Sequence, residues 1–203
     1  MKKSSFETIL LLCAFLVAMS VGVAQAGAVI DFDGTPVGPI AGNLYKDSGV
    51  LLSTDAGSHL EVCGPVSYTN TPYNYLCAIK STCGDSRIIV DFVLPGTTTP
   101  GLTDIVVFYL TDPEAGTGAT WKAEIFGYGN VLIDTKTGNT NDEISVAFTR
   151  LNKEISRMIF TPSEDYEGID TLSHCDVVPV PEPASLSALG FGIMGIIFSR
   201  RRR

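Results

Sequence analysis

Hydrophobic and polar residues alternate in short runs along most of this chain, and this pattern restricts the fold to one built from β-strands. Ile88, Val90, Phe92 and Leu94 share one face, with Asp91 on the other. Side chains of a strand point alternately to its two faces, so such a run predicts a half-buried strand. No stretch of the body shows sustained helical periodicity. Further strand-like runs are 28–33, 59–63, 104–110, 120–128, 131–135, 143–148, 155–161 and 168–173.

Clusters of Gly, Pro, Asn and Asp separate these runs and indicate turns. Gly129-Asn130, between two alternating runs, predicts a β-hairpin. Short strands at this spacing, about eight to ten of them, are typical of an antiparallel β-sandwich. We therefore predict an all-β, jelly-roll-like domain over residues 27–177. The only Trp, Trp121, begins a strand and is expected in the core.

The first 26 residues have the three parts of a secretory signal peptide. Lys2 and Lys3 form the positive start, residues 9–17 form a short apolar core, and Ala26 ends a small-residue cleavage pattern. A membrane-spanning helix needs a longer apolar run, about 20 residues. We predict cleavage between Ala26 and Gly27 and export of the rest of the chain.

The C-terminal end contains a different signal. A Pro-rich lead precedes the apolar stretch 184–198, and four arginines close the chain. As a helix the stretch would measure about 22 Å, at about 1.5 Å per residue, which is short for a membrane span. The arginines place the tail in the cytoplasm and the body outside. The residues alone therefore predict a short C-terminal transmembrane helix.

Three features in this order resemble the PEP-CTERM sorting signal over residues 178–203. They are Pro181-Glu182-Pro183, a short Gly-containing apolar helix, and the cluster Arg200, Arg201, Arg202 and Arg203. The resemblance implies that a membrane protease called exosortase recognises the tail, after transient anchoring in the inner membrane. Cleavage near Pro181-Glu182-Pro183 would then bring the body to the cell surface or an extracellular polysaccharide matrix. Such a signal assigns a destination and no biochemical activity.

The exported body is strongly acidic. Without the residues of both signals, the 22 acidic and 14 basic residues of the chain become 20 and 8, a net charge near −12. The whole chain has a net charge of −8. This balance disfavours nucleic acid, whose phosphates need a basic surface, and is compatible with cations.

Export leaves four cysteines, because Cys13 lies in the signal peptide. They are Cys63, Cys77, Cys83 and Cys175, and an even number in an oxidising compartment predicts two disulfides. Their spacing does not fit a zinc site. Three pairings are open. A short loop closes at low entropic cost, which favours Cys77–Cys83 and, by elimination, Cys63–Cys175.

The chain lacks the motifs of several hydrolytic and phosphate-binding sites. It contains no Gly-x-Ser-x-Gly, no His-Glu-x-x-His and no phosphate loop. Its two histidines, His59 and His174, are expected at strand ends or core edges. We therefore expect a non-enzymatic protein with no obligatory cofactor. Two alternatives stay open: a hydrolase acting on matrix polysaccharide, since carboxylates are plentiful, and a purely structural surface protein.

The order of runs in the body also resembles the β-sandwiches often found ahead of this sorting tail. The body opens with Ile30–Asp33, continues through a hairpin over 121–132, and closes with 155–160 and 168–172. Such domains are similar to carbohydrate-binding modules and galactose-binding-like folds. The resemblance implies an extracellular polysaccharide as partner.

A long segment, residues 64–86, holds the candidate ligand-binding residues. It contains Tyr68, Tyr73 and Tyr75 together with Cys77 and Cys83. One interpretation is a cross-linked loop that presents aromatic platforms to a sugar. The other is a long loop whose tyrosines form the small cluster that keeps it ordered.

The resemblance also suggests a structural calcium ion. The first and last strands of a jelly roll commonly lie side by side, so Asp31 and Asp33 could approach Asp170. Calcium binds six to eight oxygens at about 2.3–2.6 Å, so backbone carbonyls and water would have to join three carboxylates. The alternative is three solvent-facing acids on strand surfaces.

Overall fold

The computed structural model describes residues 27–64, 74–80, 86–111, 120–139, 144–163 and 168–181. Within them the regular structure consists of strands and one short 3₁₀ helix, which confirms the predicted all-β class. In chain order the elements are β1 (Ala28–Asp31), β2 (Gly38–Pro39), η1 (Lys46–Ser48), β3 (Val50–Thr54), β4 (Ser58–Cys63), β5 (Tyr75–Lys80), β6 (Ile88–Phe92), β7 (Gly101–Leu102), β8 (Ile105–Thr111), β9 (Thr120–Gly127), β10 (Val131–Asn139), β11 (Ile144–Thr149), β12 (Arg157–Pro162), β13 (Gly168–His174) and β14 (Val178–Pro179).

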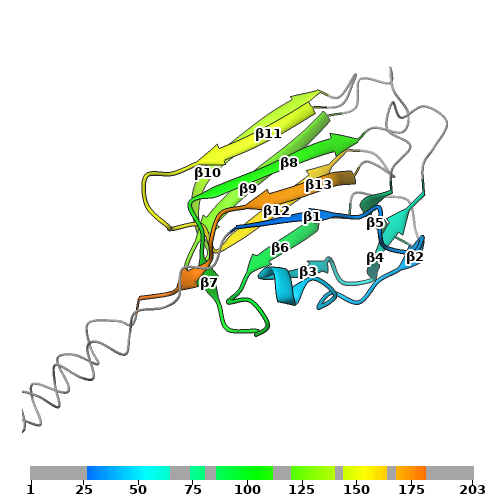
Figure 1. Cartoon of the computed structure of the whole chain (residues 1–203). Helices are drawn as coiled ribbons and strands as arrows, with labels where there is room; N and C mark the ends of the chain where they lie inside the picture. The colour runs from blue at the N-terminus through cyan, green and yellow to red at the C-terminus, as the bar shows by residue number, and fades with distance from the viewer. Residues whose placement is uncertain are drawn as a thin grey trace, which may run out of the picture.

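Two antiparallel sheets form the layers of a β-sandwich (Figure 1). Sheet A has the strand order β11-β8-β13-β5-β4-β2, and β1 pairs with β13 beside this path. Sheet B has the order β10-β9-β12-β6-β3. Figure 1 shows strands of the two layers running in similar directions, as in aligned sandwiches. The early strand β1 and the late strand β13 lie side by side, as expected for a jelly-roll-like domain.

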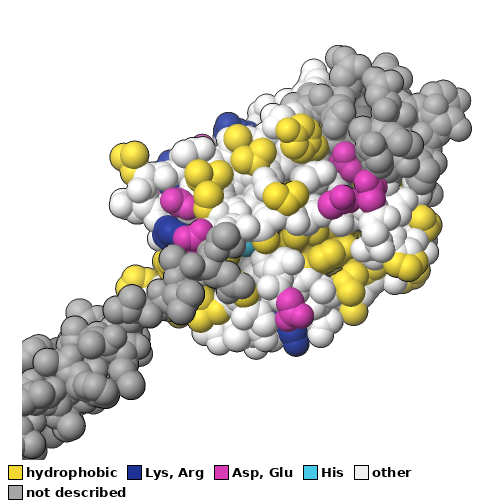
Figure 2. Space-filling view, in the orientation of Figure 1, with side chains coloured by type: hydrophobic (Ala, Val, Ile, Leu, Met, Phe, Trp, Pro, Cys, Tyr) yellow, Lys and Arg dark blue, Asp and Glu magenta, His cyan; other side chains and the backbone are white. Residues whose placement is uncertain are grey.

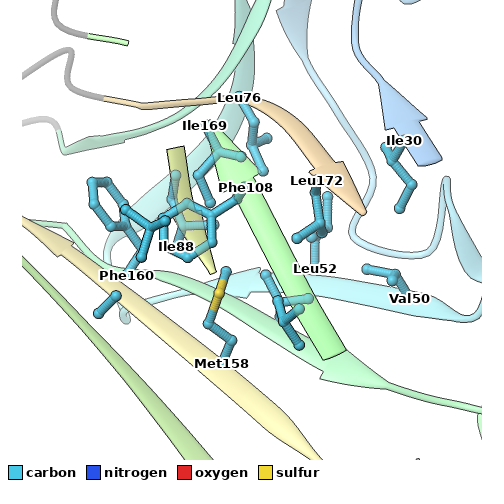
Figure 3. Close-up of a cluster of buried hydrophobic side chains, with 14 of the residues drawn as sticks. Ile30, Val50, Leu52, Leu76, Ile88, Phe108, Met158, Phe160, Ile169 and Leu172 are labelled. Atoms are coloured by element: carbon cyan, nitrogen blue, oxygen red, sulfur yellow. The ribbon is translucent and has the colours of Figure 1, made fainter. Parts of the chain in front are cut away.

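The core lies between the sheets and follows the alternation of the sequence. Strand β6 buries every second residue, Ile88, Val90 and Phe92, and β12 does the same with Met158 and Phe160. Side chains from both sheets meet in the cluster of Figure 3, where the rings of Phe108 and Phe160 are 6.1 Å apart. Each such side chain stabilises the fold by roughly 1.5–3 kcal/mol on burial. Trp121 is also buried, which confirms its predicted place in the core.

A lysine links the two sheets where their edge strands β10 and β11 meet. The Lys136 ammonium group, on β10, donates a hydrogen bond of 2.6 Å to the carbonyl oxygen of Ala147 on β11. The same ammonium lies 5.3 Å from the ring centre of the buried Phe148. A long aliphatic stem with a charged end suits this place, because the stem covers apolar surface while the charge stays near solvent.

The β9–β10 hairpin has its turn where the sequence predicts it. Gly127 pairs with Val131, and the turn between them holds Gly129 and Asn130 at φ 78° and 61°. These values lie in the left-handed region, which glycine and asparagine adopt at the lowest cost. Tyr128, Gly129 and Asn130 of this turn line a hollow on the surface of the molecule.

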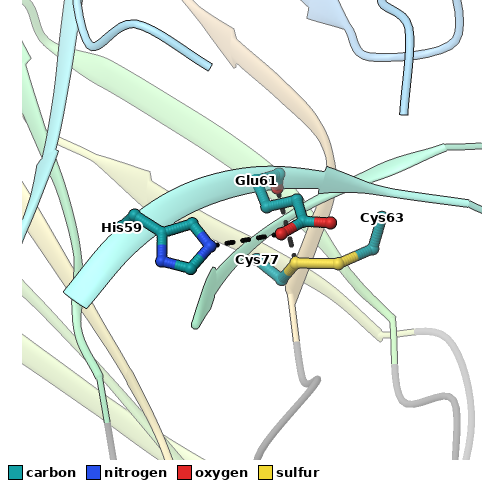
Figure 4. Close-up of a disulfide and its surroundings, with 4 residues drawn as sticks. All are labelled: His59, Glu61, Cys63 and Cys77. Atoms are coloured by element: carbon teal, nitrogen blue, oxygen red, sulfur yellow. Dashed lines mark hydrogen bonds and ion pairs between the residues drawn. A yellow bond between two sulfur atoms is a disulfide. The ribbon is translucent and has the colours of Figure 1, made fainter. Parts of the chain in front are cut away.

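The structure corrects the predicted disulfides. Cys63 on β4 is bonded to Cys77 on β5, with 6.3 Å between their Cα atoms (Figure 4). The pairs Cys77–Cys83 and Cys63–Cys175 were therefore wrong predictions. Loop entropy weighs only closure along the chain, whereas the pairing of β4 with β5 already brings Cys63 and Cys77 together. Among the described residues Cys175 has a free thiol, and burial raises the pKa of that thiol. Cys83 lies outside the described residues.

The sandwich extends into the start of the predicted sorting signal. Val178 and Pro179 form β14 and pair with β7, and the buried Val177 packs so closely on Gly101 that a side chain at 101 would not fit. Pro181 is exposed. The described residues contain no helix with the length and hydropathy needed to cross a bilayer.

The remaining parts of the two predicted signals lie outside the described residues. They are the signal peptide 1–26 and, in the tail, Glu182, Pro183, the apolar stretch 184–198 and Arg200–Arg203.

Candidate functional site

A row of four side chains crosses the outer face of sheet B. The strand register places Leu51 beside Asp91, Asp91 beside Arg157, and Arg157 beside Phe126. Each is half-buried, while the neighbouring residues along each strand fill the core. The row therefore combines two apolar side chains with a central pair of opposite charges.

The central pair is a two-pronged ion pair. Arg157 Nε donates to Asp91 Oδ1 at 2.6 Å, and Arg157 Nη2 donates to Oδ2 at 3.1 Å. The hydrogen bonds that Arg157 donates to Asp91 raise the pKa of Arg157 above its ordinary value. Arg157 Nη1 donates to Asn130 Oδ1 at 3.0 Å, so the hairpin turn is joined to the pair. Guanidinium, carboxylate and amide form a fixed polar array on the sheet surface.

This array borders a surface hollow of about 310 Å³, which we call the turn hollow. Tyr128 is 63% exposed at its wall, beside the polar array. The lining residues are Leu51, Asp91, Phe92, Val93, Thr98, Pro100, Tyr128, Gly129, Asn130, Ser156 and Arg157. An exposed aromatic ring can stack on an apolar ring face, while the array offers both donors and acceptors.

None of the three tyrosines predicted to form aromatic platforms is among the described residues that line the turn hollow. Tyr75 is only 2% exposed and packs with Cys63 and Cys77, so it presents no surface to a sugar. That prediction was wrong for Tyr75, because β5 turns this side chain into the molecule. Tyr68 and Tyr73 lie outside the described residues.

The three predicted calcium ligands lie on neighbouring elements, because β1 pairs with β13. Asp31 Oδ1 accepts the backbone N–H of Asp33 at 2.7 Å, and Asp33 Oδ1 accepts that of Asn74 at 2.8 Å. Asp170 is buried. Figure 2 shows one group of acidic side chains on the face that it presents and further acidic side chains elsewhere on that face. Among the described residues no group of three acidic, His or Cys side chains is arranged to hold a metal, and the calcium site stays a prediction.

Neither histidine lines the turn hollow. His59 is exposed on β4 and lies 3.3 Å from Glu61 (Figure 4). His174 is buried at the end of β13, with its ring nitrogens near the carbonyl oxygens of Ser48 and Cys175. Both therefore occupy the strand and core-edge positions expected of them.

Sequence reasoning did not single out the residues of the turn hollow. Asp91 and Arg157 are 66 residues apart, and only the pairing of β6 with β12 brings them together. The Gly129-Asn130 turn was the one available signal. It places Tyr128 and Asn130 at the tip of a hairpin, where side chains are free to line a surface.

Several solved structures are similar to this chain at low sequence identity and with TM-scores below 0.5. The K2 cleaved adhesin domain of Lys-gingipain is 10% identical, with 75% of this chain and 98% of that chain covered and a TM-score of 0.39. The xylan-binding domain from CBM 22 is 14% identical, with coverages of 79% and 96% and a TM-score of 0.37. TmCBM61, solved with β-1,4-galactotriose, is 12% identical, with coverages of 69% and 95% and a TM-score of 0.35. No curated protein matches the chain.

The end of the chain is recognised by a family model. Residues 179–203 match the PEP-CTERM protein-sorting motif, which confirms the signal predicted from Pro181-Glu182-Pro183 and the terminal arginines. The motif marks a protein that is exported and processed at the membrane. Its first residue, Pro179, is the last residue of β14.

Proposed function

We propose that this protein is a non-enzymatic polysaccharide-binding β-sandwich, exported and then released or attached at the cell surface by an exosortase. The PEP-CTERM motif supports the sorting step. The turn hollow supports the binding step, and the observation that carries it is the exposed Tyr128 beside the array of Asp91, Asn130 and Arg157.

The chemistry of the hollow matches that of a sugar. A pyranose has apolar C–H faces and a rim of hydroxyl groups that both donate and accept hydrogen bonds. The ring of Tyr128 offers an apolar surface with a polar tip to one such face. Asp91, Asn130 and Ser156 supply acceptor oxygens within reach of the rim, since the Ser156 hydroxyl already donates to the Phe126 carbonyl oxygen, and Arg157 supplies the donors. A few fixed polar groups beside an apolar surface are the usual design of a ligand site.

The charges of the site favour a neutral polysaccharide. Asp91 neutralises Arg157, so the array offers hydrogen bonds without a net charge. The exported body carries a net charge near −12, which repels an anionic chain. We therefore propose a neutral glycan as the ligand class.

The same hollow gives little support to the hydrolase alternative. Glycoside hydrolysis ordinarily uses two carboxyl groups, one on each side of the bond that breaks. Asp91 is the single carboxylate among the residues that line the turn hollow, and Arg157 engages both of its oxygens.

A glycan array followed by calorimetry tests the binding proposal. Tyr128→Ser should weaken the affinity for the bound glycan at least about tenfold, because it removes the stacking surface; tenfold corresponds to about 1.4 kcal/mol. Tyr109→Ser is the matched control, since Tyr109 is 40% exposed on β8 of sheet A, away from the hollow. Binding to no glycan, or equal losses in both variants, would reject the turn hollow as the site. Release of reducing ends from the same glycans would favour the hydrolase.

A further inference from the structure

The sorting tail leaves the sandwich beside the connection between β11 and β12, residues 150–156. β14 pairs with β7, and Thr103, the residue after β7, pairs with Ile155 of this connection. Lys153 of the same connection donates a hydrogen bond of 2.9 Å from its ammonium group to the carbonyl oxygen of Asp176, just ahead of β14. Figure 1 shows β7 and the β11–β12 connection at the same end of the molecule.

The turn between β9 and β10 lies at this end too. The backbone N–H of Ser156 donates to the carbonyl oxygen of Phe126 at 2.8 Å. A Cβ at Gly127, the last residue of β9, would lie 3.3 Å from the carbonyl oxygen of Glu154. The β9–β10 turn, the β11–β12 connection and the exit of the tail are therefore neighbours.

Large apolar side chains are exposed on these neighbouring segments. Of the eight large hydrophobic residues that are exposed in the described part of the chain, four lie here: Tyr128, Val131, Leu132 and Leu151. Leu151 is fully exposed, and Val131 is 65% exposed. Tyr128 lines the turn hollow, and we call the other three the apolar tips. Single exposed hydrophobic residues are normal, whereas several at one end beside the tail indicate an interaction surface.

The tail is too short to hold this end far from a bilayer. Pro179 pairs with Gly101 in the sandwich, and the apolar stretch 184–198 begins five residues later. Five residues span at most about 18 Å at about 3.6 Å per residue. If the stretch enters the membrane, as the sequence predicts, the apolar tips belong to the end of the body that faces the lipid.

The charges at this end do not attract an anionic lipid surface. Arg150 is paired with Glu154 at 2.7 Å, and Lys153 with Asp176 at 3.2 Å. The exported body as a whole has a net charge near −12. A contact between this end and a bilayer must therefore come from the apolar side chains, and it should not weaken in high salt.

We propose that this end of the body docks on the lipid bilayer while the tail anchors the chain, with Val131, Leu132 and Leu151 inserted among the headgroups. The inference rests on the membrane anchoring predicted for the tail and is independent of the sugar ligand. Three apolar side chains alone bind a membrane weakly, since even one myristoyl chain reaches only about 10⁴ M⁻¹. The short tether makes docking intramolecular, at an effective concentration on the order of millimolar. Removal of the tail ends the docking.

Tryptophan fluorescence quenched by brominated lipids tests the contact. The chain is expressed in a host without exosortase, so that the tail is retained, and reconstituted in nanodiscs of phosphatidylcholine brominated near the headgroups. Leu151→Trp should be quenched at least about threefold more than Val37→Trp, the matched control. Val37 is 59% exposed next to β2, which lies toward the other end of the molecule (Figure 1), and the buried Trp121 gives the same background in both. Equal quenching at the two positions, or a chain that does not stay in the discs, overturns the proposal.

A second set of variants tests whether the apolar tips act together. With Leu132→Trp as the reporter, Leu151→Asp should lower the ratio of docked to undocked protein about tenfold, which corresponds to about 1.4 kcal/mol. Val37→Asp should leave that ratio unchanged. Sodium chloride at 0.5 M should leave the quenching unchanged or raise it. An inert Leu151→Asp, equal effects of the two aspartates, or quenching lost in high salt overturns the proposal.

Discussion

At the scale of single residues, the ion pair between Asp55 and Arg87 shows how a neighbouring side chain changes a pKa. Arg87 Nε donates to Asp55 Oδ1 at 3.0 Å, and the backbone N–H of Arg87 donates to Asp55 Oδ2 at 3.1 Å. The hydrogen bonds from Arg87 lower the pKa of Asp55 below its ordinary value of 3.8. Both side chains are partly exposed, so solvent limits the energy of the pair to about 1 kcal/mol or less.

The ion pair of Asp55 and Arg87 should make the free energy of unfolding depend on pH in the acid range. Because the folded state lowers the pKa of Asp55, the pair stabilises the protein above pH 3.8 and loses its contribution as the pH falls through the lowered value. Asp55→Asn should therefore reduce the free energy of unfolding at pH 7 by up to about 1 kcal/mol, and by less near pH 2. Urea unfolding at both pH values measures this, and a loss independent of pH would contradict it.

The tyrosines show what could not be predicted residue by residue. Tyr75 belongs to a Tyr-rich segment that the sequence predicts to bind a ligand, and it is buried. Tyr128 is not predicted as a ligand-binding residue, and it is exposed. Tyr75 lies on β5 and is buried with its neighbours there, whereas Tyr128 lies in the turn after β9, where no sheet face meets the core. A tyrosine in an irregular run does not reveal by itself which of these two places it will occupy. The regular run around Ile88 and Phe92 does reveal which residues are buried, and there the prediction was confirmed.

At the scale of the elements, the pairing of strands determines which distant residues come into contact, and the distance between them along the chain does not. Alternation predicted most strands and Gly129-Asn130 predicted the hairpin, because both signals are local in the sequence. The disulfide and the Asp91–Arg157 pair depend on register between strands, which no local pattern encodes. The sequence therefore predicted the fold class well and the candidate site poorly.

The Cys63–Cys77 bridge should account for a large share of the stability of β4 and β5. The two cysteines are separated by 14 positions, and a loop of about 15 residues corresponds to about 3 kcal/mol in the chain-entropy estimate. Cys63→Ala combined with Cys77→Ala should lower the free energy of unfolding in urea by about 2–4 kcal/mol. Peptide mapping without reductant checks the pairing, and a Cys77–Cys83 fragment would show it to be wrong.

On the scale of the whole molecule, the folded body and the sorting motif overlap. The motif begins at Pro179, and Pro179 is hydrogen-bonded into the sandwich through β14 and β7. Removal of the tail beyond this point leaves every described strand intact. Processing near Pro181-Glu182-Pro183 should therefore release a body with unchanged stability.

Truncation locates the boundary of the fold. A chain ending after Asp176 loses β14 and the buried Val177, so its melting temperature should fall by roughly 3 to 6 °C relative to one ending after Pro181. Val177→Ala in the longer chain should reproduce part of this loss. Equal melting temperatures for the two truncated chains, in calorimetry, would show that β14 adds nothing to the body.

The β14–β7 ladder also determines how the body responds to tension on its tail. Any pull on the C-terminus reaches this two-residue ladder first, whereas β13 behind it is held along its length by β1, β5 and β8. The short ladder should therefore peel before the sandwich yields. Peeling frees Val178 and Pro179, about 7 Å of extended chain at about 3.5 Å per residue, while Asp176 stays bound to Lys153. If the body is attached through its C-terminus, the β14 segment should therefore extend under force while the two sheets stay folded.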